Sequence, residues 1–330
     1  MNMPLAIILL VVGLIVLWKC ADLLVAGAVG LAKRLGISSL VVGLTVVAMG
    51  TSAPEVAASI ASVLQEEGGG DMAVGNVFGS NIANLALVGG LIALIRPLVV
   101  SSRVLRREVP VMLLAGLMLL PILLDKHVSG PEAIVLLAVF AGLMALLIYF
   151  SRKEAAAGKE TLIEVADELE KAEQLAGRPL GTNALFVAVG LAGLAAGAKM
   201  TVVGAVFIGK EKFGLSDAVI GLTIIAFGTS LPELVTCVVA TLKGHHDISV
   251  GNLVGSNIFN TLLVTGAAGA VKPFDLQGRR LAGGTDYWIM IAVCAAFAGT
   301  AIIGKRTIGR RAGALLVCTY VAYVIYLFYA

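Results

Sequence analysis

Two glutamate residues stand out because each lies inside a long apolar segment as the last residue of the same short motif. The sequence GTSAPE ends at Glu55, and the sequence GTSLPE ends at Glu233. A carboxylate at membrane depth costs about 3 kcal/mol, and such groups face the interior of a helix bundle, where they bind ions or relay protons. Neither motif contains a basic residue that could neutralise its glutamate. A bound cation explains the charge and its polar neighbours together, so the pattern predicts a cation site.

The other residues of each motif add oxygen atoms to the carboxylate. Pro54 has no N–H, so the carbonyl of Gly50, four residues earlier, loses its helical partner. Thr51 and Ser52 precede Glu55 by four and three residues, which places their hydroxyl groups on the same face of a helix. The copy in the second half, GTSLPE, repeats the arrangement with Gly228, Thr229, Ser230, Pro232 and Glu233.

A second motif follows each of the first ones, as GNVFGSNIAN and as GNLVGSNIFN. It places polar side chains at successive steps of four residues, which form an all-oxygen stripe on a helix: Asn76, Ser80 and Asn84, and again Asn252, Ser256 and Asn260. Its glycines leave room for close helix contact. For Asn76, Asn81, Asn252 and Asn257, hydrogen bonds between helices are an equally good explanation.

The ligand types restrict which cation the site could bind. Carboxylate, carbonyl, hydroxyl and amide oxygens suit hard cations, and Ca²⁺ takes about 6 to 8 of them in an adaptable geometry. No histidine or cysteine joins either motif, which argues against Zn²⁺ and copper. Mg²⁺ loses its water reluctantly and is a weaker candidate. One Ca²⁺ or two Na⁺ would balance the two carboxylates, which provides a basis for mutually exclusive occupancy.

The elements that carry these motifs are membrane-spanning helices. With 59% hydrophobic and 14% charged residues and a mean hydropathy of +0.99, the chain is too apolar for a soluble globular protein. The four cysteines, Cys237 among them, have no metal-site spacing and are expected to pack as small apolar residues. The sequence predicts an all-α polytopic membrane protein. Its ten expected spans are 5 to 26, 39 to 64, 72 to 95, 108 to 124, 131 to 150, 183 to 208, 216 to 242, 248 to 270, 285 to 303 and 312 to 329.

The sequence is internally duplicated. Residues 41 to 56 and 219 to 234 are identical at ten of sixteen positions, and residues 74 to 88 and 250 to 264 at ten of fifteen. Five spans in each half is an odd number, so the second copy is expected to cross the membrane in the opposite direction. Inverted repeats of this kind are typical of secondary transporters. The expected organisation is a first repeat (1–150), a linker (151–181) and a second repeat (182–330).

The distribution of basic residues predicts the orientation. If the N-terminus lies outside, most lysines and arginines between the spans face the cytoplasm, in agreement with the positive-inside rule. Both termini are then outside a plasma membrane or a prokaryotic inner membrane, and the linker is cytoplasmic. Lys19, Asp22 and Lys199, which lie within spans, are expected to extend towards the membrane surface or to pair with other charges.

At the two pairs of motifs, the chain resembles the Ca²⁺/cation antiporter superfamily, and specifically its prokaryotic sodium/calcium exchangers. The resemblance covers both halves and implies ten helices around a shared Ca²⁺ and Na⁺ site. Glu55 and Glu233 would be the shared carboxylates. The resemblance implies further ligands from Thr51, Ser52, Thr229, Ser230, Ser80, Ser256, Asn84 and Asn260, and from backbone oxygens near Ala48 and Ala226. Asn260 stands where the K⁺-dependent branch has Asp, which argues against K⁺ co-transport.

The expected function is therefore Na⁺/Ca²⁺ antiport by alternating access, with the two ions and the lipid bilayer as partners. No enzymatic activity, resident cofactor, nucleic acid or obligate protein partner is expected. The nearest alternative is a proton/Ca²⁺ antiporter, in which the glutamates take up protons, although the Thr-Ser pairs disfavour it. A cation channel would use the same oxygens as a continuous pore. A membrane-embedded hydrolase has no support beyond the two carboxylates.

Overall fold

The protein is mostly helical. The computed structural model describes residues 1–65, 68–156, 178–214, 226–278, 281 and 283–329. In these ranges, eight helices are long and apolar enough to cross a membrane, and the bent pair Ser39–Thr51 and Ala53–Val63 makes a ninth candidate. Most of them extend beyond the predicted ends. The first residues of the predicted span 216 to 242 lie outside the described ranges, and its remainder contains the shorter apolar helix Leu231–Leu242.

The helices follow one another in the same way in the two halves. The first half contains α1 (Met3–Leu35), α2 (Ser39–Val42), η1 (Gly43–Val47), α3 (Ala48–Thr51), α4 (Ala53–Val63), α5 (Gly69–Ile82), η2 (Ala83–Val88), α6 (Gly89–Ile95), β1 (Leu98–Val99), η3 (Val104–Glu108), α7 (Val109–Leu124), β2 (His127–Val128) and α8 (Gly130–Ala156). The second half contains α10 (Leu180–Phe213), α12 (Ala226–Thr229), α13 (Leu231–Leu242), α14 (His246–Phe259), η5 (Asn260–Val264), α15 (Thr265–Val271), β3 (Phe274–Asp275), α16 (Thr285–Ile303), β4 (Thr307–Ile308) and α17 (Arg310–Tyr329). The η segments are π-helical turns.

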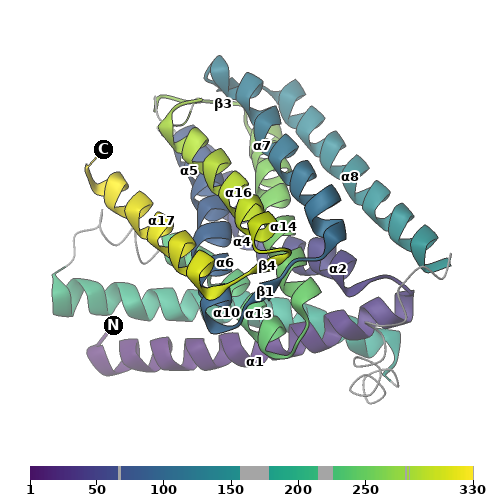
Figure 1. Cartoon of the computed structure of the whole chain (residues 1–330). Coiled ribbons are helices and arrows are strands. Elements are labelled where there is room, and N and C mark those ends of the chain that lie inside the picture. Colours follow the sequence, from purple (N-terminus) through teal and green to yellow (C-terminus); the bar gives the residue numbers. More distant parts are fainter. Residues whose placement is uncertain (66–67, 157–177, 215–225, 279–280, 282, 330) are drawn as a thin grey trace.

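The two longest helices, α1 and α10, lie side by side across one face of the other helices (Figure 1). Glycines allow this close contact, because a Cβ atom on Gly197 of α10 would lie 3.0 Å from the carbonyl oxygen of Gly13 on α1. The outward face of α1 exposes Leu, Ile and Val side chains, as expected for a helix in contact with lipid. Its C-terminal end is capped by Gly36 in the left-handed conformation, at φ 61°.

The helices that carry the glutamates are broken at the GTSxPE motifs. Helix α3 ends at Thr51, Ser52 leaves the helical conformation with ψ near 3°, and α4 begins at Ala53 with Pro54 in its first turn. The two parts are bent by 41° relative to each other. The GTSLPE copy has the same break, since Ser230 has φ −87° and ψ 2° between α12 and α13. Proline fits the first turn of a helix, where its missing N–H has no partner to lose.

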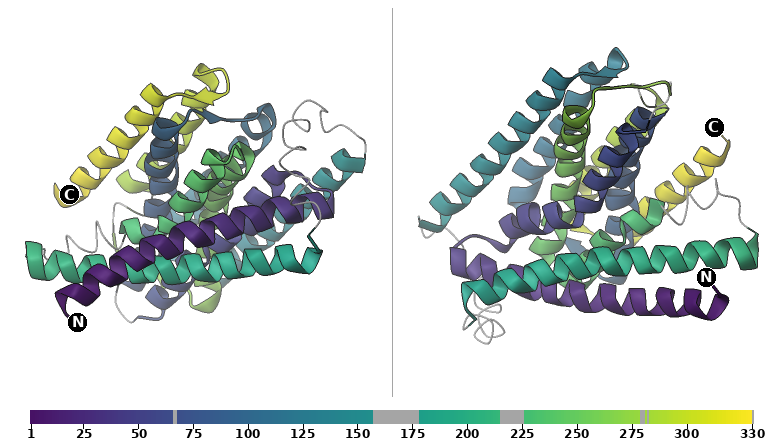
Figure 2. Two further views of the ribbon diagram at one scale, coloured as in Figure 1. Left: turned by 90° about the horizontal axis from the view of Figure 1, so that it is seen from below. Right: turned by 180° about the vertical axis from the view of Figure 1, so that it is seen from behind.

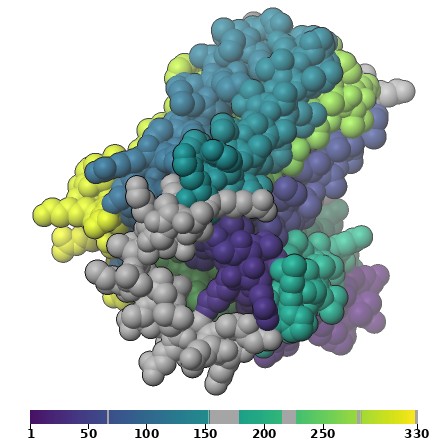
Figure 3. Space-filling model, turned by 90° about the vertical axis from the view of Figure 1, so that its right-hand side faces the viewer, coloured from purple at the N-terminus to yellow at the C-terminus, as the bar shows by residue number. Residues whose placement is uncertain are grey.

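The two halves are packed into one another. Helix α14 of the second half lies against α2, η1 and α3 of the first, α15 packs on α8, and α17 packs on α6. Two short antiparallel ribbons also join the halves, because β1 pairs with β4 and β2 pairs with β3. The back and lower views show the same crossing of the long helices under the others (Figure 2), and α8 forms the upper part of the side surface in Figure 3. The motifs therefore lie at a junction between the halves.

Candidate functional site

The two glutamates are buried at the start of the helices that follow the breaks. Glu55 lies in the first turn of α4 and is 1% exposed, and Glu233 lies in the first turn of α13 and is 0% exposed. The two carboxylates are close enough to interact electrostatically. Each one benefits from the positive end of its helix dipole, which favours negative charge in the first turn. The structure therefore brings together the two acidic side chains that the sequence singled out.

Hydroxyl groups of the first motif reach across to the second half of the chain. Ser52 Oγ donates a hydrogen bond to Glu233 Oε1 at 3.3 Å, and Thr51 Oγ1 donates to Asn252 Oδ1 at 3.1 Å. The sequence placed both hydroxyls beside Glu55 of their own motif. The break at Ser52 turns them instead towards α13 and α14, which pack against α3. The site is thus built across the junction.

The polar stripes of the third and eighth predicted spans lie beside the helices that carry the glutamates. Glu55 is carried by α4, which packs against η5 with Asn260, and Glu233 is carried by α13, which packs against η2 with Asn84. Several buried polar atoms of this region form no hydrogen bond with the described part of the chain: both carboxylate oxygens of Glu55, Oε2 of Glu233, Oγ of Ser230 and Ser256, and both amide atoms of Asn84 and Asn260. Ser80 is also buried. Buried polar groups are normally satisfied by protein, ordered water or a ligand, so these atoms mark a place where water or an ion would bind.

The available atoms fit a hard cation. Most of them are oxygens, and neither glutamate forms an ion pair with a basic side chain in the described ranges. No group of three or more His, Cys, Asp or Glu side chains that could hold a metal ion occurs among the described residues. The donor set is therefore two carboxylates with neutral oxygens, the chemistry that Ca²⁺ accepts and that Zn²⁺ does not prefer.

Two asparagines are held in matching positions by residues that the sequence reasoning missed. Asn76 Nδ2 donates to Ser59 Oγ at 2.9 Å, and Asn252 Nδ2 donates to Cys237 Sγ at 3.2 Å. Ser59 and Cys237 each follow a glutamate by four residues, and that shared spacing in the two copies was the available signal. Holding the nitrogen turns the amide oxygen of Asn252 towards Thr51. Cys237 is therefore more than an apolar packing residue.

The other residues that the sequence singled out have different surroundings. The carbonyl oxygen of Ala48 accepts a hydrogen bond from Ser52 N at 3.0 Å, and it lies 3.3 Å from Thr51 Oγ1, whose single proton it shares with Asn252 Oδ1. Asn81 Nδ2 contacts Thr261 Oγ1 at 3.0 Å, which agrees with the explanation of hydrogen bonds between helices. Ala226 begins the short helix α12, and Thr229 ends it.

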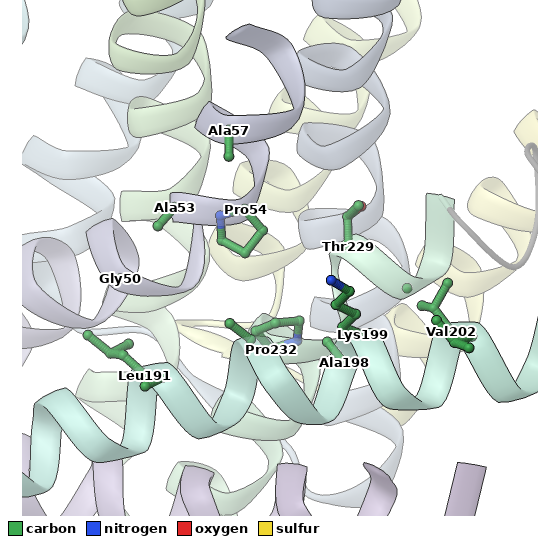
Figure 4. A pocket seen from close by; sticks show the side chains of 14 residues that line it. Gly50, Ala53, Pro54, Ala57, Leu191, Ala198, Lys199, Val202, Thr229 and Pro232 are labelled. Carbon is green, nitrogen blue, oxygen red and sulfur yellow. The ribbon is translucent and has the colours of Figure 1, made fainter. Parts of the chain in front are cut away.

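A cavity of about 700 Å³ lies between the two GTSxPE motifs and helix α10. It is lined by Gly50, Pro54, Gly228, Thr229 and Pro232, and by small apolar residues of α10. Figure 4 shows the two prolines facing the cavity from the two halves, with Lys199 of α10 pointing between Thr229 and Pro232. Since both glutamates are almost fully buried, the carboxylates are closed off from this cavity in the present conformation.

Comparison with known proteins places this geometry in a family. The family model described as "Sodium/calcium exchanger protein" matches residues 5–149 and 182–329. Among curated proteins, the chain is 39% identical to the "Putative antiporter CaxA" of Alkalimonas amylolytica, over 99% of each chain. It is 32% identical to the "Sodium/calcium exchanger MaX1" of Methanosarcina acetivorans, over 98% of each chain.

Among solved structures, the sodium/calcium exchanger from Methanococcus jannaschii superposes with a TM-score of 0.80 at 26% identity. The match covers 98% of this chain and 99% of that one. These findings confirm the resemblance to the Ca²⁺/cation antiporters that the motifs indicated. The chain is therefore an integral membrane protein that belongs to the sodium/calcium exchanger family of transporters.

Proposed function

We propose that this protein exchanges Na⁺ for Ca²⁺ across the membrane by alternating access. The observation that carries the proposal is the pair of buried glutamates, one from each half, which have no basic partner in the described ranges and are surrounded by unpartnered oxygen atoms. Two negative charges in a low-dielectric site strongly favour cation binding. One Ca²⁺ or two Na⁺ neutralise them, so the two ions compete for one site.

The proposed ligands follow the donor atoms of the motifs. Glu55 and Glu233 bind Ca²⁺ and share in Na⁺ binding. The other proposed ligands are the side chains of Thr51, Ser52, Thr229, Ser230, Ser80, Asn84, Ser256 and Asn260, and backbone oxygens at Ala48 and Ala226. Hydroxyl and amide oxygens are neutral, and they suit a second cation that the carboxylates share. This abundance of neutral oxygens supports Na⁺ rather than protons as the exchanged ion.

We propose ten spans in two inverted repeats, 1–150 and 182–330, with both termini outside and residues 151–181 in the cytoplasm. The family model matches the chain in two segments that fall within these repeats. The ribbons also support the inverted arrangement: β1 and β3 follow the third span of their own halves, and each pairs with a strand of the other half. Such repeats allow alternating access when one part moves against the other.

The test is ion transport by the purified protein in liposomes. Vesicles loaded with Na⁺ are diluted into radioactive Ca²⁺, with and without an outward Na⁺ gradient. We expect Ca²⁺ uptake that depends on the Na⁺ gradient. Glu55→Gln and Glu233→Gln should each reduce the uptake at least about a hundredfold, since each removes a charge from a buried site where one charge is worth about 3 kcal/mol.

Glu132→Gln is the matched control, because this glutamate caps the start of α8 by accepting a hydrogen bond from the backbone N–H of Ser129 at 2.9 Å. It should retain wild-type uptake. Uptake that ignores the Na⁺ gradient but follows a pH gradient would replace Na⁺ with protons in the proposal. Ca²⁺ flux without any counter-ion dependence would indicate a channel.

A further inference from the structure

Lys199 carries the only charge among the described residues that line the cavity behind the two motifs. It lies near the middle of α10, and its amino group points into the cavity between Thr229 and Pro232 (Figure 4). The sequence suggested that this lysine extends towards the membrane surface or pairs with another charge. In the structure its side chain points towards the backbone that precedes the two glutamates.

The residue at the corresponding position in the first half is also charged, but it has a partner. Residues 20–28, CADLLVAGA, align with residues 197–205, GAKMTVVGA, so Asp22 of α1 matches Lys199 of α10. Asp22 Oδ1 forms an ion pair with Lys243 Nζ at 2.5 Å. In the described part of the chain, Lys199 forms no hydrogen bond or ion pair. An unpaired charge within a membrane helix is costly, and such residues are usually functional.

Lys199 lies on the cavity side of the residues that carry the two glutamates. Pro54 and Pro232 precede Glu55 and Glu233 directly in the sequence, and both prolines line the same cavity as Lys199. No acidic residue lines the cavity within the described ranges. Most of the cavity wall is apolar, so a charge beside it is screened less than the same charge in open water.

We propose that Lys199 is a fixed positive charge that weakens cation binding at the Glu55 and Glu233 site. It offsets part of the negative charge of the empty site, and it keeps the affinity low enough for the ion to leave. This inference rests on the proposed function, since it takes the glutamate pair as the ion site. In this proposal Lys199 acts on the ion through its electric field and does not coordinate it.

The proposal predicts a dependence on ion charge. The repulsion energy between a fixed charge and a divalent ion is twice that for a monovalent ion at the same place. Because a dissociation constant depends exponentially on energy, the factor by which Lys199 changes the Ca²⁺ dissociation constant is the square of the factor for one Na⁺. Lys199→Met should therefore tighten Na⁺ binding about threefold per ion and Ca²⁺ binding about tenfold. A change in packing alone has no reason to follow this square relation.

The experiment measures direct binding of Na⁺ and of radioactive Ca²⁺, in separate titrations, to the purified full chain in lipid nanodiscs. The variants are Lys199→Met, Lys199→Arg and, as a matched control, Lys19→Met. Lys19 is an exposed lysine of α1 and does not line the cavity. We expect tighter binding for Lys199→Met only, with wild-type constants for Lys199→Arg and Lys19→Met.

Charge restoration provides a second readout on one folded protein. In Lys199→Cys, with Cys20→Ala and Cys318→Ser to remove the other accessible thiols, aminoethyl methanethiosulfonate adds a positive side chain of nearly lysine length. We expect this reagent to return the Ca²⁺ affinity to the wild-type value. The neutral methyl reagent should leave it high, and the negative sulfonatoethyl reagent should raise it further.

The possible failures are distinguishable. If the wild-type protein binds neither ion, the proposed function is wrong. If the wild-type protein binds both ions but Lys199→Met has the same constants, this inference alone is wrong. Equal shifts for Na⁺ and Ca²⁺, or no response to the sign of the added charge, would also overturn it.

Discussion

Cys237 and Ser59 have the same position in the two halves and the same hydrogen-bonding role. Each accepts a hydrogen bond from the amide nitrogen of an asparagine, and each donates to a backbone carbonyl of the following helix, at Ser249 for Cys237 and at Ala73 for Ser59. The thiol and the hydroxyl thus make matching hydrogen bonds in the two halves. Because the nitrogen of Asn252 is held by Cys237, its amide oxygen faces Thr51 and accepts a hydrogen bond from it.

This equivalence predicts the outcome of two substitutions at one residue. Cys237→Ser should retain the hydrogen bond from Asn252 and change the free energy of unfolding by less than about 1 kcal/mol. Cys237→Val has a similar volume but no acceptor, so it leaves a buried N–H unpartnered and should destabilise the protein by about 1–3 kcal/mol. Thermal unfolding of the purified protein measures the difference, and Ca²⁺ binding should weaken only in the valine variant. Equal stability of the two variants would contradict this role.

At the level of elements, the packing of α14 on η1 and α3 brings the two motifs together. Gly251 and Gly255 of α14 face the first half with almost no free space. A Cβ atom on Gly255 would lie 2.8 Å from Leu44 O and 2.8 Å from the Cβ of Ala48. This contact sets how closely Asn252 approaches Thr51, because both residues lie at the same junction. Glycine here is required by helix separation and not by a turn.

We predict that Gly255→Ala separates α14 from η1 and destabilises the protein by about 1–3 kcal/mol, since extra atoms in a packed contact force the backbones apart. Gly142→Ala is the matched control. Gly142 lies in α8, and a Cβ atom added to it would meet nothing within 4 Å. Alanine there should stabilise the helix slightly, by about 0.5–1 kcal/mol. Thermal unfolding of the two variants, together with Ca²⁺ binding, tests the contrast; a harmless Gly255→Ala would show that the contact is adaptable.

In the whole molecule, the two halves share one core. Buried residues of both halves, such as Phe78 and Tyr287, belong to the same hydrophobic cluster, and their rings lie 5.9 Å apart in an edge-to-face arrangement. Helices α8 and α17 pack on partners from the opposite half, and each ribbon takes one strand from each half. Neither half could bury its apolar surface in the same way without the other.

This arrangement predicts the behaviour of a split chain. Residues 1–156 and 178–330, produced together as separate chains, should assemble, co-purify through a tag on one of them and catalyse Ca²⁺ uptake. Each half produced without the other should be degraded or aggregate, because its surface at the junction is exposed. Size-exclusion chromatography and liposome uptake measure the two outcomes. A first half that is stable by itself would show that the halves are independent units.

Much of the candidate site was predictable from local sequence. The glutamates at 55 and 233 were identifiable because carboxylates are rare in apolar segments, and the duplicated motifs pointed to paired elements and to the family. Pro54 indicated disturbed helical hydrogen bonding near Gly50, because it removes a backbone donor, and the structure shows a break nearby at Ser52. All of these properties depend on residues within a few positions of one another, or on the comparison of one half with the other.

Tertiary structure decided which atoms meet. Ser52 bonds to Glu233 of the other half, Cys237 holds Asn252, and Lys199 faces the cavity behind the two motifs. The ribbons of two residues each were too short to leave an alternating pattern in the sequence. Spacing along a helix shows which side chains share a face, but the partner of that face depends on how distant helices pack. The sequence by itself therefore determined the chemistry of the groups, and only the fold determined their neighbours.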